Sequence, residues 1–383
     1  MKKFFAYTKS YFNRTDKIFW IIAFLISLYS LLLILSVSRN SDFGYFKVQL
    51  ISITAGYIGA FLITKSDYRK IADYWYYVAG VCILLIIFTF IFGTAVTGNS
   101  GVDAKAWIKL PGGITFQPSE LAKIGFIVTF SKHLAFLRQH DQLKSFKQIV
   151  FLGLHALVPM GLTHLQGDDG AAIIFFFMFL FMSFAAGIQL RYFIATFVLL
   201  VCSIPILWKY VLAEYQKQRL ISQLNPESDP LGMGFQQMQG KLSIASGRIF
   251  GQGYFNGPRV GFGKKGVVPV QQSDFIFSVA GEELGFIGCL LVIALLLFLI
   301  LRTFRIAYKS SDNLGCYICF GFIGMVASQA IFNLGMCLSV LPVMGVTLPF
   351  FSAGGSSAAC LYLGLGLVQS VYMQKDDDDL AAT

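Results

Sequence analysis

The sequence is poor in charged residues, and this scarcity excludes most classes of protein. Only 13% of its 383 residues are Asp, Glu, Lys or Arg, about half of the roughly 25% that is usual in a soluble domain. Seven cysteines spread along a long apolar chain exclude a small secreted domain held by disulfides. Disorder is excluded because 39 Phe and 17 Tyr cannot stay solvated. Apolar side chains make up 56% of the residues, which indicates a polytopic membrane protein.

Long apolar runs predict the fold class. About 20 apolar residues cross the hydrocarbon layer as a helix, because a backbone in lipid must satisfy its own hydrogen bonds. We expect an all-α bundle of ten transmembrane helices, forming one integral membrane domain over residues 1–383. The expected spans are 18–38, 44–64, 73–94, 119–137, 148–165, 170–188, 191–211, 274–301, 316–340 and 353–373.

The distribution of cations predicts the orientation. With the N-terminus in the cytoplasm, seventeen Lys and Arg residues face inside and only four lie in the short outer loops. Both termini are therefore expected inside, as an even number of spans requires. The charged residues 374–383 form a cytoplasmic tail to which we assign no function. We expect no cleavable signal peptide, because the first apolar run is too long for one.

Two outer segments depart from the pattern of short loops. Residues 95–118 are polar and include Trp107, and residues 212–273 form a long loop between the seventh and eighth spans. In that loop Phe235, Met238 and Leu242 recur at helical spacing, which predicts an amphipathic helix at the outer interface with its apolar face on lipid or on the bundle. The working surface is therefore expected to be extracytoplasmic.

Ionisable residues near membrane spans are hypotheses for functional sites. Pro118 favours a helix start, with Gln117 or Ser119 as its cap. Glu120 and Lys123 then lie three residues apart on one face. Two interpretations stay open: an ion pair that orients two helices, and a pair that lines a polar cavity for an anionic head group.

A second candidate is Asp274, which we expect in the first turn of the eighth span, where the helix dipole favours its charged form and desolvation opposes it. A carboxylate in that balance suits a general base; a simple helix cap is the alternative. Glu282 and Glu283 lie deeper and are expected to contact other spans. Asp168 lies in a turn whose Asp and Gly residues are explained by turn chemistry alone.

Basic residues of the long loop complete the charged groups. A solvated loop face explains most of them, but a few, such as Arg219 and Lys241, are candidates for binding phosphate. An outward cavity with a carboxylate base and such cations suits transfer of a group from a polyprenyl pyrophosphate carrier. It suits lipid transport equally, and composition does not decide between them.

Four sequence blocks are spread over nearly the whole chain: Gln117–Lys123; Ser273–Phe277 with Glu282–Gly285; Phe235–Lys241 with Gly251–Gly253; and Asn333–Met336 with Leu341–Gly345, Leu348–Phe350 and Ser352–Ser356. Together they resemble the SEDS family (shape, elongation, division and sporulation proteins). The sequence departs from the family pattern at Ala106, where an Arg is usual, in the turn Gln166–Gly170, and at Ala353, where a Tyr is usual.

The resemblance implies a peptidoglycan glycosyltransferase that polymerises lipid II with inversion, for cell-wall elongation or division. Asp274 matches the family's essential aspartate, the general base. Trp107, Glu120 and Lys123 match further positions that the family needs. The remaining candidates for binding substrate or lining the cavity are Gln117, Ser119, Arg219, Lys241 and Ser352.

The resemblance also implies partners: a class B penicillin-binding protein that acts as transpeptidase, and the rod-shape or division complex, with no nucleic acid. A divalent cation, Mg or Mn, would assist a pyrophosphate leaving group, but no acidic cluster has clear metal-ligand spacing, so a cofactor requirement stays open. Two rivals remain: a lipid II flippase, and a non-catalytic scaffold that activates a transpeptidase.

Overall fold

The bundle of ten helices is confirmed. The computed structural model describes residues 14–39, 43–97, 103–109, 115–224, 232–259, 268 and 270–381. In this part of the chain eight helices are long and apolar enough to span a membrane, and α6 (Pro118–Gln139) and α8 (Asp169–Ala185) bring the number to ten. The eight are α2 (Lys17–Ser38), α3 (Gly44–Lys65), α5 (Trp75–Phe92), α7 (Phe146–Leu165), α9 (Leu190–Ile206) continued by the π-helix η1 (Leu207–Val211), α12 (Ile276–Tyr308), α13 (Asn313–Cys337) and α14 (Ser356–Ala381).

Most predicted boundaries agree within a few residues, and two do not. The eighth span begins at Ile276 and ends at Tyr308, where 274–301 was expected. The tenth continues as helix to Ala381, so most of the expected tail is helical. A short helix, α4 (Tyr68–Asp73), precedes α5.

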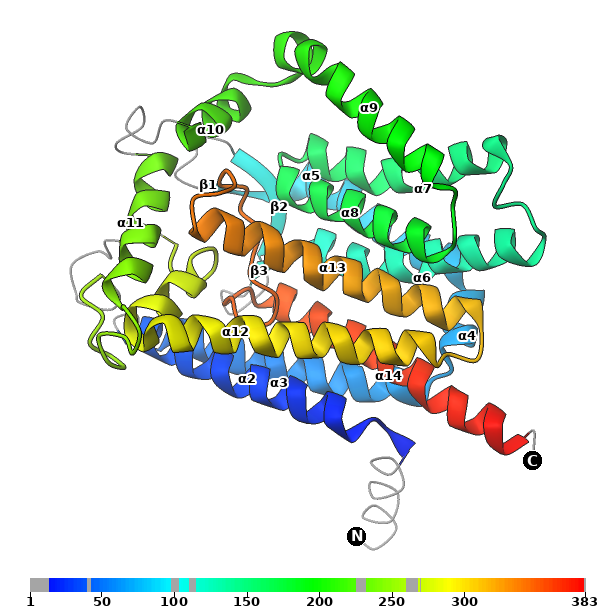
Figure 1. Ribbon diagram of the computed structural model, residues 1–383, viewed down its shortest axis with the longest axis horizontal. Coiled ribbons are helices and arrows are strands. Elements are labelled where there is room, and N and C mark those ends of the chain that lie inside the picture. Colours follow the sequence, from blue (N-terminus) through cyan, green and yellow to red (C-terminus); the bar gives the residue numbers. More distant parts are fainter. Residues whose placement is uncertain are drawn as a thin grey trace, which may run out of the picture.

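The two described ends of the chain lie at the same end of the bundle (Figure 1). Asp16, which caps α2, accepts two hydrogen bonds from Arg302 of α12, at 2.5 and 2.9 Å. The backbone N–H of Asp16 donates to Gln369 of α14 at 3.0 Å. The connection that precedes α12 lies at the opposite end, where α11 (Met233–Ser246) crosses the helix ends.

The polar segment after α5 forms a small antiparallel sheet, which the sequence did not predict. Its strands are β1 (Thr94–Thr97), β2 (Asp103–Lys109) and β3 (Thr115–Phe116), in the order β1-β2-β3. Trp107 of β2 pairs with Thr94, and Ile108 pairs with Phe116. The sheet therefore ties Trp107 to the start of α6.

The long loop contains two helices, α10 (Glu214–Leu224) and α11. In α11 the predicted apolar face points away from the bundle, since Met238 and Leu242 are 45% and 42% exposed. The opposite face packs on α12 through small residues. A Cβ atom on Gly240 would lie 2.6 Å from the Phe275 ring, and one on Gly247 would lie 1.8 Å from the carbonyl oxygen of Gly281.

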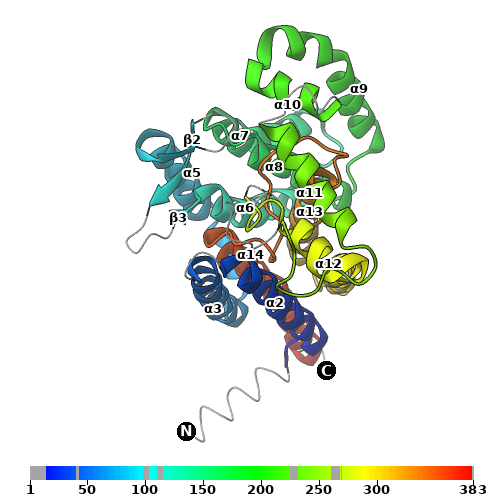
Figure 2. The same ribbon diagram turned by 90° about the vertical axis from the view of Figure 1, so that its left-hand side faces the viewer.

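Helix α9 stands at the edge of the bundle, and none of its 17 residues is buried. Figures 1 and 2 show α9 and α10 forming an arch beside the other helices. The arch brings α10 back over the end of the bundle, where it carries Arg219 to the cavity described below.

Helix α12 is broken at Gly285, which has φ 67° and ψ −158°, a conformation essentially restricted to glycine. Backbone groups of the preceding loop fill the break. Gln252 N–H donates to the carbonyl of Glu282 at 2.8 Å, and Phe286 N–H donates to the carbonyl of Arg248 at 2.8 Å. The break fixes the first turns of α12 to the loop and so orients the segment that follows Asp274.

Glu282 and Glu283 lie beside this break, and both are buried. The Ser36 hydroxyl of α2 donates to Glu283 at 2.5 Å. The backbone N–H of Arg259 donates to Glu282 at 2.9 Å. Glu283 thus contacts another span, as expected, whereas Glu282 contacts the loop.

Substituting Gly285 by Ala is expected to destabilise the protein by about 1–3 kcal/mol, the usual cost of a strained backbone. The added Cβ would also lie 2.4 Å from the backbone nitrogen of Gly251. Thermal unfolding of the detergent-purified protein measures the effect. Gly153→Ala in α7 is the control, because a Cβ there meets nothing within 4 Å. Equal melting temperatures for the two variants would contradict the assigned strain.

Candidate functional site

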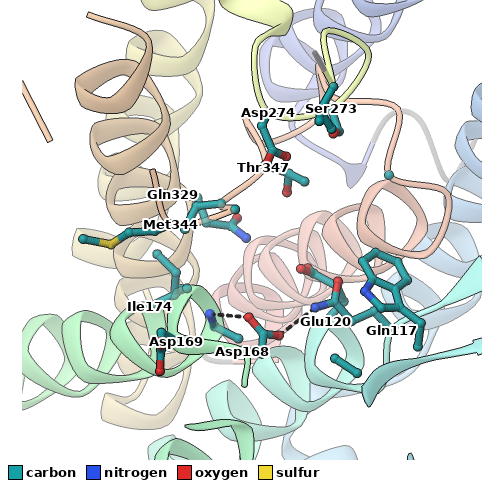
Figure 3. Close-up of a pocket in the computed structure, with 18 of the residues that line it drawn as sticks. Gln117, Glu120, Asp168, Asp169, Ile174, Ser273, Asp274, Gln329, Met344 and Thr347 are labelled. Atoms are coloured by element: carbon teal, nitrogen blue, oxygen red, sulfur yellow. Dashed lines mark hydrogen bonds between the residues drawn. The ribbon is translucent and has the colours of Figure 1, made fainter. Parts of the chain in front are cut away.

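A polar cavity of about 490 Å³ lies at the end of the bundle where α11 crosses, and its size is typical of small-molecule sites. Figure 3 shows Asp274 and Thr347 on one side, Gln117, Glu120 and Asp168 on the opposite side, and Gln329 between them. The predicted site residues that line the cavity are Trp107, Gln117, Glu120, Lys123, Arg219 and Asp274.

Glu120 and Lys123 form an ion pair in the first two turns of α6. The Lys123 ammonium lies 2.9 Å from the Glu120 carboxylate, and the two side chains are 2% and 8% exposed. Both residues also line the cavity. The structure therefore combines the two interpretations of this pair, because one buried ion pair contributes to helix packing and to the cavity wall.

Asp168 belongs to the same side of the cavity, although turn chemistry alone had explained it. It caps α8 by accepting the Ala171 N–H at 3.0 Å. Its other oxygen accepts the Gln117 amide at 2.7 Å and the Ser119 hydroxyl at 3.2 Å. Burial raises the pKa of Asp168, and the Ala171 hydrogen bond and the Lys123 charge offset part of the effect.

The sequence predicted that Gln117 or Ser119 caps α6. In the structure neither side chain does so. Gln117 occupies the N-cap position of α6 but makes no side-chain cap bond. Both side chains instead bind Asp168 of the neighbouring helix. Ser119 is buried and is not among the described residues that line the cavity. It therefore contributes to the site only through its hydrogen bond to Asp168.

Asp274 lies in the turn just before α12, so its expected place in the first helical turn is wrong. The helix begins at Ile276, and the N-cap position is occupied by Phe275. Asp274 N–H donates to the carbonyl of Val270 at 3.2 Å. Burial raises the pKa of Asp274 to about 6, and the Ser273 hydroxyl and the Arg219 charge lower it in part. Desolvation therefore outweighs the groups that favour the charged form.

Two buried polar residues hold the turn that carries Asp274. The Asn333 amide of α13 donates to the carbonyls of Asp274 and Val346, both at 2.8 Å. The Ser352 hydroxyl donates to the carbonyl of Ser273 at 2.5 Å and accepts the Leu348 N–H at 2.8 Å. Ser352 lies behind the cavity wall as a positioning residue. Asn333 was missed as one, although an amide within an apolar span is itself a signal.

Two basic residues lie away from the site. Lys241 is exposed on α11, whose buried face carries Gly240 and Ser243 instead. Lys105 is exposed in β2 beside the buried Ala106. Neither lysine is among the described residues that line the cavity, where Lys123 and Arg219 supply the positive charge.

A divalent cation has no preformed site in the described residues. Four carboxylates line the cavity: Glu120, Asp168, Asp169 and Asp274. They do not converge, since no group of three or more His, Cys, Asp or Glu side chains in the described ranges could hold a metal ion. Asp168 and Glu120 are already bound by side chains of the protein. We therefore derive no step through a metal.

Comparison with known proteins identifies the family. The profile described as "Cell cycle protein", built on FtsW, RodA and SpoVE, matches residues 16–377. The chain belongs to the SEDS family. Among its relatives is peptidoglycan glycosyltransferase MrdB of Escherichia coli K12, 31% identical over 95% of this chain and 97% of that protein. Another is the probable peptidoglycan glycosyltransferase FtsW of Geobacter metallireducens, 32% identical over 94% and 95%.

The fold of this SEDS protein also matches a solved one. A chain in the structure of a peptidoglycan synthase complex, described for its coordination of polymerization and crosslinking, superposes with a TM-score of 0.77. The two chains are 28% identical, and the match covers 94% of this chain and 98% of the other.

Three of the four SEDS sequence blocks contribute residues to the cavity. The first block contributes Gln117, Glu120 and Lys123, the second contributes Ser273 and Asp274, and the C-terminal blocks contribute residues 344–345 and 353–354. The long-loop block does not line it. Its residues on α11 and in the loop after it pack against α12 instead, and so support the site from outside.

Proposed function

We propose that the chain polymerises lipid II at the outer face of the bacterial inner membrane, with Asp274 as general base. The family and its named relatives are those of peptidoglycan glycosyltransferases. The observation that carries the assignment to this site is Asp274 itself, a half-buried carboxylate on the cavity wall with a pKa of about 6. A base of that pKa is largely ionised at neutral pH and can still accept a proton.

The reaction needs one proton acceptor and no covalent intermediate. The 4-hydroxyl of the acceptor GlcNAc attacks the anomeric carbon of the MurNAc that ends the growing chain. The new C–O bond forms as the bond from that carbon to the pyrophosphate oxygen breaks, with inversion, and undecaprenyl pyrophosphate leaves. Asp274 takes the hydroxyl proton.

The other residues of the cavity bind and orient the substrate in this proposal. Lys123 and Arg219 attract the pyrophosphate. Trp107, which is half-buried in the wall, offers an apolar ring face to a sugar. Asp168 holds Gln117 and Ser119 in place beside the ion pair.

The orientation and the partner complete the proposal. Both termini lie in the cytoplasm, and the end of the bundle that holds the cavity faces outward. The excess of Lys and Arg at the opposite end supports this orientation. The partner is a class B penicillin-binding protein acting as transpeptidase, within the rod-shape or division complex. The similar chain from a complex that polymerises and crosslinks supports this part.

Proteoliposomes distinguish the polymerase from the flippase. Lipid II is placed in the membrane with the purified chain, and glycan polymer and lipid II translocation are followed in the same vesicles. The proposal expects polymer, made without net translocation. Translocation without polymer would establish the flippase instead.

The pH dependence of kcat/KM should fall on the acid side as the pH drops through about 6, because protonated Asp274 cannot act as a base. Arg219→Gln should move this limb to higher pH, since the Arg219 charge lowers the pKa of Asp274. Lys217→Gln on the same helix is the control and should leave the limb in place, because Lys217 pairs with Glu214. A limb that stays at the same pH in Arg219→Gln would contradict the charge coupling.

A further inference from the structure

Gln329 is a buried amide whose role in the cavity is unexplained by the fold. It comes from the middle of α13, is 1% exposed, and lines the cavity between the Asp274 side and the Glu120 side (Figure 3). Its Oε1 atom has no hydrogen-bond partner among the described residues. An acceptor left unpaired in the protein interior costs free energy that a bound donor would recover.

The unpaired acceptor is particular to Gln329, because the next turn of α13 carries an amide that is fully used. Asn333, four residues later on the same face, donates to two carbonyls at 2.8 Å. Other buried glutamines with one unpaired atom still bond through the other. Gln49 donates to Ser30 at 3.2 Å, and Gln369 accepts from Asp16 at 3.0 Å.

The surroundings of Gln329 favour a particular ligand group. Figure 3 shows Ile174 and Met344 on the same side of the cavity as Gln329, and both residues also line the cavity. An acetamido group matches this combination, because its N–H can donate to Oε1 while its methyl packs on apolar lining such as Ile174. A phosphate has no N–H to donate, and a bare hydroxyl would leave the apolar surface uncovered.

We propose that Gln329 binds the 2-acetamido group of one sugar of the substrate and thereby selects N-acetylated sugars. This inference rests on the proposed function, since it assumes a lipid-linked N-acetyl disaccharide in the cavity. Gln329 is then a specificity residue on the wall between Asp274 and the Glu120–Lys123 pair. The acetamido contact fixes the position of the sugar ring relative to the base.

The test is a cycle of protein and substrate variants, read as kcat/KM for polymerisation by the purified full-length protein. The substrates are lipid II and two analogues, each with a hydroxyl in place of the acetamido group on one sugar. We expect Gln329→Met to lower kcat/KM for lipid II about 10- to 100-fold, as for an unmade buried hydrogen bond. For one of the two analogues, the wild-type kcat/KM should be lower than for lipid II by a similar factor. With that analogue, Gln329→Met should not lower kcat/KM any further.

Losses that multiply for both analogues would overturn the proposal, as would an unchanged kcat/KM for Gln329→Met. Gln369→Met, a buried glutamine at the other end of the bundle, is the matched control and should discriminate like the wild type. Gln329→Glu keeps an acceptor and the size of the side chain, so it should retain more activity than Gln329→Met. The comparison of these two variants separates loss of the acceptor from a general folding defect.

Direct titration of lipid II binding separates this inference from the proposed function. If the wild type binds lipid II without polymerising it, the proposed function fails. The same cycle measured on Kd then still tests the contact, and equal affinities of Gln329→Met and the wild type for lipid II would overturn it.

Discussion

Glycan polymerisation from lipid II is expected to fall about 10²–10⁴-fold when Asp274 is replaced by Asn, the usual cost of losing a general base. The amide keeps the size of the side chain. The contacts that hold the turn are made by its backbone, through Asn333 and Val270, and do not depend on the carboxylate. Asp274→Asn should therefore fold, insert and bind its transpeptidase while making little polymer.

Asp73→Asn is the matched control. Its carboxylate pairs with Lys132 at 2.6 Å and is 64% exposed, outside the cavity. It should polymerise lipid II at the wild-type rate. Near-normal polymer from a well-folded Asp274→Asn protein would remove Asp274 from the reaction and direct attention to Glu120. A pure scaffold would retain full function in both variants.

The second large effect concerns the buried pair of Glu120 and Lys123. Removing either partner alone is expected to destabilise the protein by about 3–5 kcal/mol, because the remaining charge is buried without its counter-ion. The double variant, with both residues replaced by Ala, should lose much less than the sum of the single losses. Unfolding of the purified proteins by heat or denaturant, with expression level as a second readout, measures the four members of the cycle.

Helix α10 offers the matched control for this cycle. Glu214 and Lys217 form a pair with the same spacing and a distance of 2.8 Å, but Glu214 is 80% exposed. Exposed pairs contribute at most about 1 kcal/mol, so this cycle should be nearly additive. Additive losses at Glu120 and Lys123 would show that the two charges are not coupled.

The sequence predicted the spans well because their physical signal is strong. Apolar runs of membrane length fix α2, α3 and most later helices to within a few residues. It predicted the cavity less completely. The ion pair and Asp274 stood out because charge near a span is costly. Gln117 and Asp168 come from different helices, and nothing in their local sequence shows that one binds the other.

Other features depend on tertiary contacts and could not be read from local patterns. The turn of Asp274 is held from α13 by Asn333, 59 residues away in the sequence. Ser352 looked like a candidate for binding substrate, yet its hydroxyl is used to join two loops. The break of α12 needs the backbone of the loop after α11, so in the sequence Gly285 appeared only as the end of the block Glu282–Gly285.

The most direct test of the central claim is polymerisation of purified lipid II by the purified wild-type protein, alone and with its transpeptidase inhibited by a β-lactam. Glycan strands should form in the presence of the inhibitor, with one undecaprenyl pyrophosphate released for each bond formed. Strands should be absent from a parallel reaction with Asp274→Asn. Failure of the well-folded wild-type protein, with its partner bound, to form any polymer would contradict the account.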